Sequence, residues 1–277
     1  MEIPPAVIDI IHRALEEDTG PGDITSTLLI PEQNKSKAIF IAKGDFVVAG
    51  IPFAKKVFTI LDSSIVFKPL FNEGAKIKKG DIIAEVSGKT LAILAGERLS
   101  LNILQRLSGI ADLTRKYVGK VAGTKAKIVD TRKTTPCLRF MEKYAVRIGG
   151  GGNHRFGLFD GILIKDNHIK AVGSIKKAVE RAKTGHHLLK IEVEVENRQG
   201  LMEAIDAGAD IVMLDNMSID EMEGAIKISQ GKVILEASGG ITLENVREIA
   251  ETGIDLISVG AITHSFKAAD ISLKIIT

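Results

Sequence analysis

The stretch KIEVEVENRQGLMEAIDAGADIVMLDN, residues 190–216, holds two short apolar runs with a helical pattern between them. The runs at 190–195 and 211–214 are typical of buried strands, and the segment 198–208 repeats apolar residues at helical spacing. A strand, a helix and a second strand in this order predict parallel strands joined by a helical crossover.

The same unit recurs along the C-terminal half of the chain. Further strands are predicted at 127–131, 161–164, 233–236 and 256–260, mostly with helical patterns between them. Six or seven parallel strands favour an incomplete α/β barrel over an open doubly wound sheet, and no GxGxxG motif follows a first strand. We therefore predict an α/β fold in which residues 108–265 form the barrel.

The N-terminal part has a different pattern. Short β-rich runs separated by Gly, Asp and Asn lie between about 36 and 95, which predicts an α+β sandwich domain over 1–107. A helix at 96–107 is expected to link it to the barrel, and its helical pattern should soften or break at Ser108-Gly109. The segment 266–277 is expected to pack back on the N-terminal domain.

Composition narrows the classes of partner and compartment. The chain has 277 residues with 37 Lys and Arg against 35 Asp and Glu, so no overall field favours nucleic acid or a membrane surface. No apolar run is long enough to span a bilayer. The single cysteine, Cys137, excludes an internal disulfide framework and suits a reducing, cytoplasmic environment.

Polar residues and glycines follow all six predicted strands. In an α/β barrel the carboxyl ends of the strands face the active site. The residues at these ends are Arg132 and Lys133, Lys165, Glu192 and Glu194, Asp215 and Asn216, Glu236 with Ser238 to Gly240, and Gly260 with Ala261. Strand ends are often polar because the chain re-enters water there, but six in succession favour one shared site.

The composition of this edge predicts an anion site. Between 127 and 170 nine basic residues stand against four acidic ones, and arginine binds carboxylate or phosphate through two parallel hydrogen bonds. Four glycines at 149–152 precede His154 and Arg155 and give the backbone freedom to approach a ligand. The glycines of SGGI (238–241) and SVGA (258–261) resemble the phosphate sites of other barrels.

Two carboxylates belong to the same predicted site. Glu194 and Asp215 are suited either to hold magnesium through substrate phosphates or to face a developing positive charge. No His and Cys cluster has the spacing of a zinc site, which disfavours a transition-metal hydrolase.

Eight ordered blocks resemble the quinolinate phosphoribosyltransferase family over nearly the whole chain. They are EEDTGPGDITS (16–26), GERLSLNILQRLSGIAD (96–112), DTRKTTPCLR (130–139), RIGGGGNHRFGLFDGILIKDNH (147–168), IEVEVEN (191–197), MLDN (213–216), EASGGI (236–241) and ISVGAITHS (257–265). One departure is Asp112, where a small residue is expected after SGIA, and it touches no site position.

The resemblance implies a magnesium-dependent enzyme of NAD biosynthesis, a pentosyltransferase acting on two small-molecule substrates. Quinolinate and phosphoribosyl pyrophosphate would give nicotinate mononucleotide, pyrophosphate and carbon dioxide. It implies a quinolinate pocket of Arg132, His154, Arg155 and Lys165, with Arg98 reaching in from the neighbouring subunit of a homodimer. A hexamer of such dimers is left open.

The resemblance also implies roles for the remaining site residues. Lys133 would meet the pyrophosphate, and Glu194 and Asp215 would bind the ribose hydroxyls or magnesium and stabilise an oxocarbenium-like transition state. The 5′-phosphate would be held by Ser238, Gly239, Gly240, Gly260 and Ala261.

Three other functions stay open at this point. A related transferase would use nicotinate or another base, or resemble the protein of this fold linked to molybdenum transport. A barrel isomerase, aldolase or lyase would use Lys165 to form a Schiff base. A non-catalytic anion-binding module would gain nothing from the acids Glu194 and Asp215 in its pocket.

Overall fold

The computed structural model describes residues 2–185 and 187–276, so Met1 and Thr277, the ends of the first and last predicted segments, lie outside the described residues. The chain divides into two compact units, each described here by itself. The first contains Met1–Leu113, Pro136–Gly149 and Phe266–Thr277, and the second contains Thr114–Thr135 and Gly150–Ser265. Within the described ranges, no helix combines the length and the apolar character of a membrane span.

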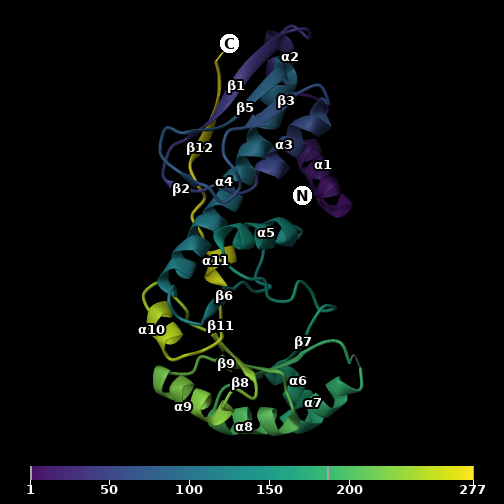
Figure 1. The fold of residues 1–277 in the computed structure, drawn as a ribbon. Helices are drawn as coiled ribbons and strands as arrows, with labels where there is room; N and C mark the ends of the chain where they lie inside the picture. The colour runs from purple at the N-terminus through teal and green to yellow at the C-terminus, as the bar shows by residue number, and fades with distance from the viewer. Residues whose placement is uncertain (1, 186, 277) are drawn as a thin grey trace. The chain divides into compact units, whose positions relative to one another are not determined.

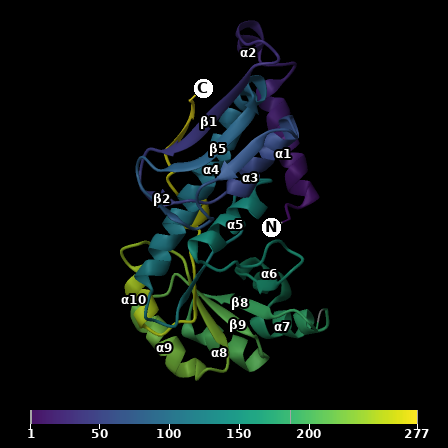
Figure 2. The ribbon, with the colours of Figure 1, turned by 45° about the horizontal axis from the view of Figure 1, so that its top comes forward.

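The first unit is built on an antiparallel sheet with the strand order β12-β1-β5-β3. Its strands are β1 (Lys35–Ala42), β3 (Val66–Pro69), β5 (Ile82–Lys89) and β12 (Ile271–Ile275), and β2 (Phe46–Val47) pairs with β4 (Lys76–Ile77). β1 and β5 run side by side in Figure 2. The segment 266–277, which was expected to pack on the N-terminal domain, contributes β12 beside β1.

Two helices, α3 (Ile51–Leu61) and the first part of α4 (Thr90–Lys120), bury the apolar face of this sheet. The unit also contains α1 (Pro5–Thr19), α2 (Ile24–Leu29) and α5 (Arg139–Gly149). Phe40 on β1, Phe58 on α3 and Phe67 on β3 pack together with ring centroids 5.8 to 6.1 Å apart. The α+β character of the N-terminal part follows from this core.

Helix α5 lies in the first unit, whereas the predicted boundary at 107 assigned residues 139–149 to the barrel. The Tyr144 hydroxyl donates a hydrogen bond to Glu73 at 2.8 Å, and its ring meets Phe53 edge-on at 5.2 Å. Glu73 also accepts the backbone N–H groups of Gly50 and Ile51. Burial raises the pKa of the Glu73 carboxyl and that of the Tyr144 hydroxyl above their usual values.

Helix α4 is continuous from Thr90 to Lys120, so the expected break at Ser108-Gly109 was wrong. Gly109 serves close packing instead of a bend. A Cβ atom built there would lie 2.3 Å from the backbone oxygen of Lys267. The glycine therefore lets the segment before β12 approach the helix.

The second unit holds one parallel sheet with the strand order β6-β11-β10-β9-β8-β7. The six predicted strands are confirmed, with ends that differ by at most two residues. They are β6 (Lys127–Val129), β7 (Ile162–Ile164), β8 (Ile191–Val195), β9 (Ile211–Asp215), β10 (Ile234–Ser238) and β11 (Leu256–Ser258). β6 and β7 do not pair, but Val129 of β6 bridges to Gly152, so the barrel is incomplete.

Helices line the outside of this sheet, as Figure 1 shows for α7, α8 and α9. The helices of the unit are α6 (Asp166–Val172), α7 (Ile175–Lys183), α8 (Arg198–Ala207), α9 (Ile219–Ser229), α10 (Val246–Glu251) and α11 (Ala261–His264). The side chains of Ser174, Asn197 and Ser218 cap α7, α8 and α9 by accepting backbone N–H groups of the first turn. Asn197 and Ser218 cap the helices that follow β8 and β9, whereas Ser174 caps the helix that follows α6.

The packing role of Gly109 can be tested within one helix. We expect Gly109→Ala to lower the free energy of unfolding by about 1–3 kcal/mol, because the added methyl meets backbone that cannot give way. Gly119→Ala, where nothing lies within 4 Å of the added atom, should raise it by about 0.5–1 kcal/mol through helix propensity. Urea titration of both variants measures the difference. If both variants changed the free energy of unfolding in the same direction and by the same amount, the packing argument would be contradicted.

Candidate functional site

The carboxyl ends of the six parallel strands surround a pocket of about 650 Å³ in the second unit. Its lining consists of Thr131, Arg132, Lys133, His154, Arg155, Leu163, Lys165, Glu194, Met213, Asp215, Asn216, Ser238, Gly239, Gly240 and Ser258. Ten of the thirteen predicted site residues are among them. The neutral lining residues Thr131, Leu163, Met213 and Ser258 were missed, because no charge or glycine marks them in the sequence.

Three predicted site residues do not line this pocket. Gly260 precedes α11 and Ala261 begins it, but a Cβ atom on Gly260 would lie 3.1 Å from the Lys133 side chain, which does line the pocket. Arg98 belongs to the first unit, where it is exposed on α4.

The cationic side of the pocket is formed by Arg132, Arg155 and Lys165. Arg155 donates to the carbonyl oxygen of Gly161 at 3.0 Å, while its Nε is buried without a hydrogen-bond partner among the described residues. Burial, and then the positive charge of Arg132, lower the pKa of Arg155. Two guanidinium groups that repel each other in this way would be stabilised by a bound anion.

The loop that carries His154 and Arg155 is fastened to the end of β6. The buried carboxylate of Asp130 accepts hydrogen bonds from Asn153 Nδ2 at 2.7 Å and from the His154 backbone at 2.9 Å. Gly152 N donates to Ile128 O at 2.8 Å. Within the run of four glycines, Gly150 has a φ of 96°, a backbone conformation that glycine tolerates best.

The acidic side of the pocket comes from β8 and β9. Glu194 forms an ion pair with Lys165, so the cation and the acid meet across the mouth of the pocket. Asp215 ends β9 and accepts a hydrogen bond from the Asn216 side chain at 3.1 Å. Asn216 has a φ of 55° and donates its backbone N–H to Ser238 O, which joins the ends of β9 and β10.

The turn after β10 presents backbone to the pocket. Gly239 and Gly240 have φ values of 90° and 60°, which disfavour any side chain. A Cβ atom on Gly239 would also lie 2.2 Å from Asn216 Oδ1. Successive backbone groups in this conformation form a concave surface suited to an anion such as phosphate.

Comparisons with known proteins show the family to which the chain belongs. The family described as "Quinolinate phosphoribosyl transferase, C-terminal domain" matches residues 110–274, and its N-terminal domain matches 23–108. This chain belongs to the quinolinate phosphoribosyl transferase family. The family assignment covers both units, including β12 in the first.

Members of this family are similar to the chain over nearly its whole length. A Bacillus subtilis protein named "Probable nicotinate-nucleotide pyrophosphorylase [carboxylating]" is 47% identical over 267 residues, 96% of this chain and 92% of the relative. A quinolinate phosphoribosyltransferase [decarboxylating] of Nicotiana glauca is 43% identical, over 97% of this chain and 82% of the relative. The structure of the nicotinate-nucleotide pyrophosphorylase from Francisella tularensis superimposes with a TM-score of 0.95 at 44% identity, over 99% and 98% of the two chains.

The role of Asp130 in holding the loop gives a prediction that does not depend on the reaction. We expect Asp130→Ala to destabilise the protein by about 1–3 kcal/mol and to speed hydrogen exchange at residues 152–155, because their donors lose a buried acceptor. The matched control is Asp255→Ala, which removes an acceptor for Leu235 N at the opposite end of the sheet. If exchange in the loop is unchanged in Asp130→Ala, other contacts hold the loop.

Proposed function

We propose that this chain transfers phosphoribosyl from phosphoribosyl pyrophosphate to quinolinate, with loss of carbon dioxide, in de novo NAD biosynthesis in the cytoplasm. The observation that carries the proposal is a single pocket with three cations on one side, two carboxylates on the other and a glycine turn between strands. The names of the similar proteins support the same reaction.

Quinolinate carries two carboxylates beside a pyridine nitrogen, so its pocket needs more than one cation. Arg132 and Arg155 each offer a planar fork for one carboxylate, and Lys165 supplies a further positive charge. His154 lies at the same wall, held by its backbone bond to Asp130. The cationic side therefore fits a dianion better than the monoanion nicotinate.

We assign phosphoribosyl pyrophosphate to the side of the pocket opposite the quinolinate carboxylates. The turn Ser238-Gly239-Gly240 would hold the 5′-phosphate through backbone N–H groups, with Gly260 and Ala261 close by. Lys133 would meet the pyrophosphate. Glu194 and Asp215 would contact the ribose hydroxyls and stabilise positive charge that develops at C1.

The same two carboxylates fit magnesium. They are hard oxygen ligands on neighbouring strands, and magnesium usually takes one or two protein carboxylates together with substrate phosphates. Bound in this way, magnesium would supply positive charge against the pyrophosphate oxygens.

The chain's own residues would then position the two reacting atoms. The C1–O bond breaks with its electron pair leaving on pyrophosphate, and the lone pair of the pyridine nitrogen forms the new bond to C1. The 2-carboxylate beside the now cationic ring nitrogen leaves as carbon dioxide, and the electron pair left on C2 takes a proton. Positioning and electrostatic stabilisation suffice for these steps, and no covalent nucleophile is needed.

The ion pair between Lys165 and Glu194 weighs against the Schiff-base alternative. A Schiff base needs a neutral amine as nucleophile, whereas an ammonium group held by a carboxylate has no free electron pair. The acids of the pocket likewise disfavour a module that only binds anions.

A homodimer completes the proposed site. Arg98 is exposed on α4, in the first unit, and is assigned to the quinolinate pocket of the neighbouring subunit. A hexamer built from such dimers remains an open alternative.

The reaction is tested by mixing the pure protein with quinolinate, phosphoribosyl pyrophosphate and magnesium. Nicotinate mononucleotide and carbon dioxide should appear at equal rates, and both should be lost when magnesium is removed. Arg132→Ala should lower kcat/KM at least about 100-fold, because a half-buried cation that meets a substrate carboxylate is lost. The control Arg181→Ala removes an exposed arginine of α7. Turnover of nicotinate but not quinolinate would refute the substrate assignment.

The shared site is tested by mixing two inactive variants. Arg98→Ala and Arg132→Ala, unfolded together and refolded as a mixture, should regain about a quarter of the wild-type activity. Half of the dimers are then mixed, and one of the two sites in each is intact. Neither variant should regain activity when it is refolded alone. Absence of any recovery, with mixed dimers verified by mass spectrometry, would place Arg98 outside the neighbour's site.

A further inference from the structure

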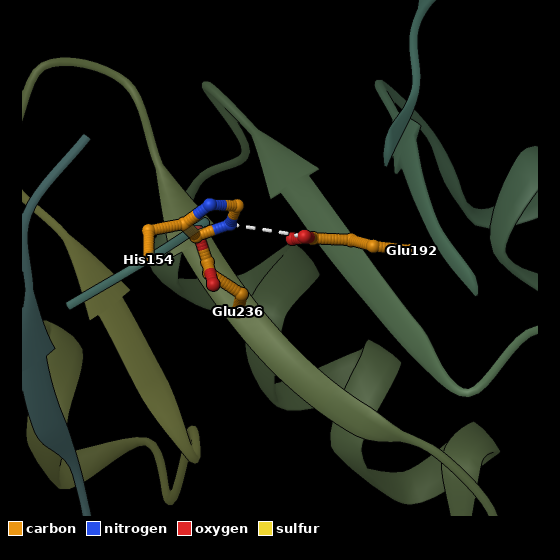
Figure 3. A group of neighbouring side chains, drawn as sticks. All are labelled: His154, Glu192 and Glu236. Atoms are coloured by element: carbon orange, nitrogen blue, oxygen red, sulfur yellow. Dashed lines mark ion pairs between the residues drawn. The ribbon is translucent and has the colours of Figure 1, made fainter. Parts of the chain in front are cut away.

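Three ionisable side chains, one of them the pocket residue His154, meet behind the pocket lining, and Figure 3 shows how they lie. His154 comes from the loop before β7, Glu192 from β8 and Glu236 from β10. His154 Nε2 lies 2.9 Å from Glu192 Oε2 and 3.7 Å from Glu236 Oε1. The side chains of Glu192 and Glu236 are 7% and 1% exposed, so water cannot solvate their charges.

The hydrogen bonds of the His154 ring define which nitrogen carries its proton. The backbone N–H of Arg155 donates to His154 Nδ1 at 2.9 Å, so Nδ1 must present its lone pair. The ring proton is therefore on Nε2, where it points to Glu192. If the ring also carried a proton on Nδ1, that N–H would point at the backbone N–H of Arg155 and the hydrogen bond would be lost.

Several carboxylate oxygens in this cluster lack a hydrogen-bond donor. Glu192 Oε1 and both oxygens of Glu236 are buried without a partner among the described residues. Two buried negative charges close together would be costly, and a proton on Glu236 removes one of them. Burial, followed by the negative charge of Glu192, raises the pKa of Glu236 to about 7.

The surroundings of Glu236 limit what else could compensate its charge. The strand between Glu236 and Glu192 is β9, and its residue paired with Glu236 is Met213, which carries no charge. On the other side β11 offers the neutral Leu256 and the hydroxyl of Ser258, which acts to lower the pKa of Glu236 but less strongly than burial and Glu192 raise it. The charged groups that face Glu236 are Glu192, His154 and, after β7, Lys165, and Lys165 is already paired with Glu194.

A metal ion is the other occupant that such a group suggests, because one ligand atom of each residue lies within 4.8 Å of the others. The position of the proton on the His154 ring argues against a metal ion. A metal ligand needs a free lone pair at Nε2, and that nitrogen carries the proton that Nδ1 cannot hold. One proton on Glu236 removes one of the two buried negative charges without displacing that hydrogen bond.

We propose that Glu236 is a positioning residue whose proton leaves the buried pair with one negative charge and holds His154 in its Nε2–H form at the pocket wall. Its effect on substrate rests on the function proposed above. When Glu236 loses the proton, a second negative charge appears beneath the pocket that takes the quinolinate dianion. The affinity for quinolinate then falls as the pH rises, since the protonated form of Glu236 is the one that favours an anion.

The first test is the binding of quinolinate to the full-length protein by calorimetry at pH 6 and pH 9, without phosphoribosyl pyrophosphate. The wild-type Kd should rise about tenfold between these pH values. Glu236→Gln, which mimics the protonated acid at every pH, should reduce this rise to less than about twofold. The control is Glu73→Gln, which removes a buried carboxyl of the first unit and should keep the wild-type pH dependence. If Glu236→Gln retains the full rise, the proposal is overturned.

The second test does not involve quinolinate. Infrared spectra of the wild-type protein at pH 6 should contain a protonated carboxyl band that weakens as the pH rises and is absent from Glu236→Gln but present in Glu73→Gln. The same band in Glu236→Gln, or a stoichiometric metal ion in the wild type that this variant lacks, would overturn the proposal. If Glu236→Gln does not fold, Glu236→Met removes the same proton. If the infrared result is as expected but quinolinate does not bind, the proton assignment stands and the proposed function fails.

Discussion

Parallel pairing of six strands is the constraint on which the site depends. Because the strands of the second unit all run the same way, the residues that follow them meet at one edge, although they are far apart in the sequence. Glu194 and Met213 are register partners on β8 and β9, and Met213 is in turn paired with Glu236 on β10. A side chain one position further along a strand would face the other side of the sheet.

Glu192 and Glu194 of β8 point to the same side of the sheet but lie at different depths, because they are two residues apart along the strand. Glu194 is close enough to the edge to pair with Lys165 at the pocket mouth, whereas Glu192, two residues earlier, lies beneath the pocket with Glu236. The same residue type therefore has two environments on one strand. The outer acid, 15% exposed, is balanced by a cation, and the inner one is balanced by a histidine N–H and by the proton of its neighbour.

Much of this arrangement could be predicted from the sequence because each strand end carries a charge or a glycine. The pattern of apolar runs indicated the six strands, and the residues after them indicated most of the pocket. It could not separate Glu192 from Glu194, since both lie in the same alternating run on one face of the strand. Only the folded structure shows that Glu192 meets His154 and Glu236, whereas Glu194 pairs with Lys165. Nor could it foresee that Gly109 accommodates the backbone of Lys267, because that contact joins segments remote in sequence.

Buried acids beneath an anion site appear at first to oppose its function, yet the cations above them explain their presence. The charge of Arg132 lowers the pKa of Arg155, so the two guanidinium groups repel each other and gain from nearby negative charge. Glu192 acts on Arg155 in the opposite direction and keeps it charged. One negative charge beneath the pocket therefore stabilises the two guanidinium groups, whereas a second would compete with the anion that they are placed to bind.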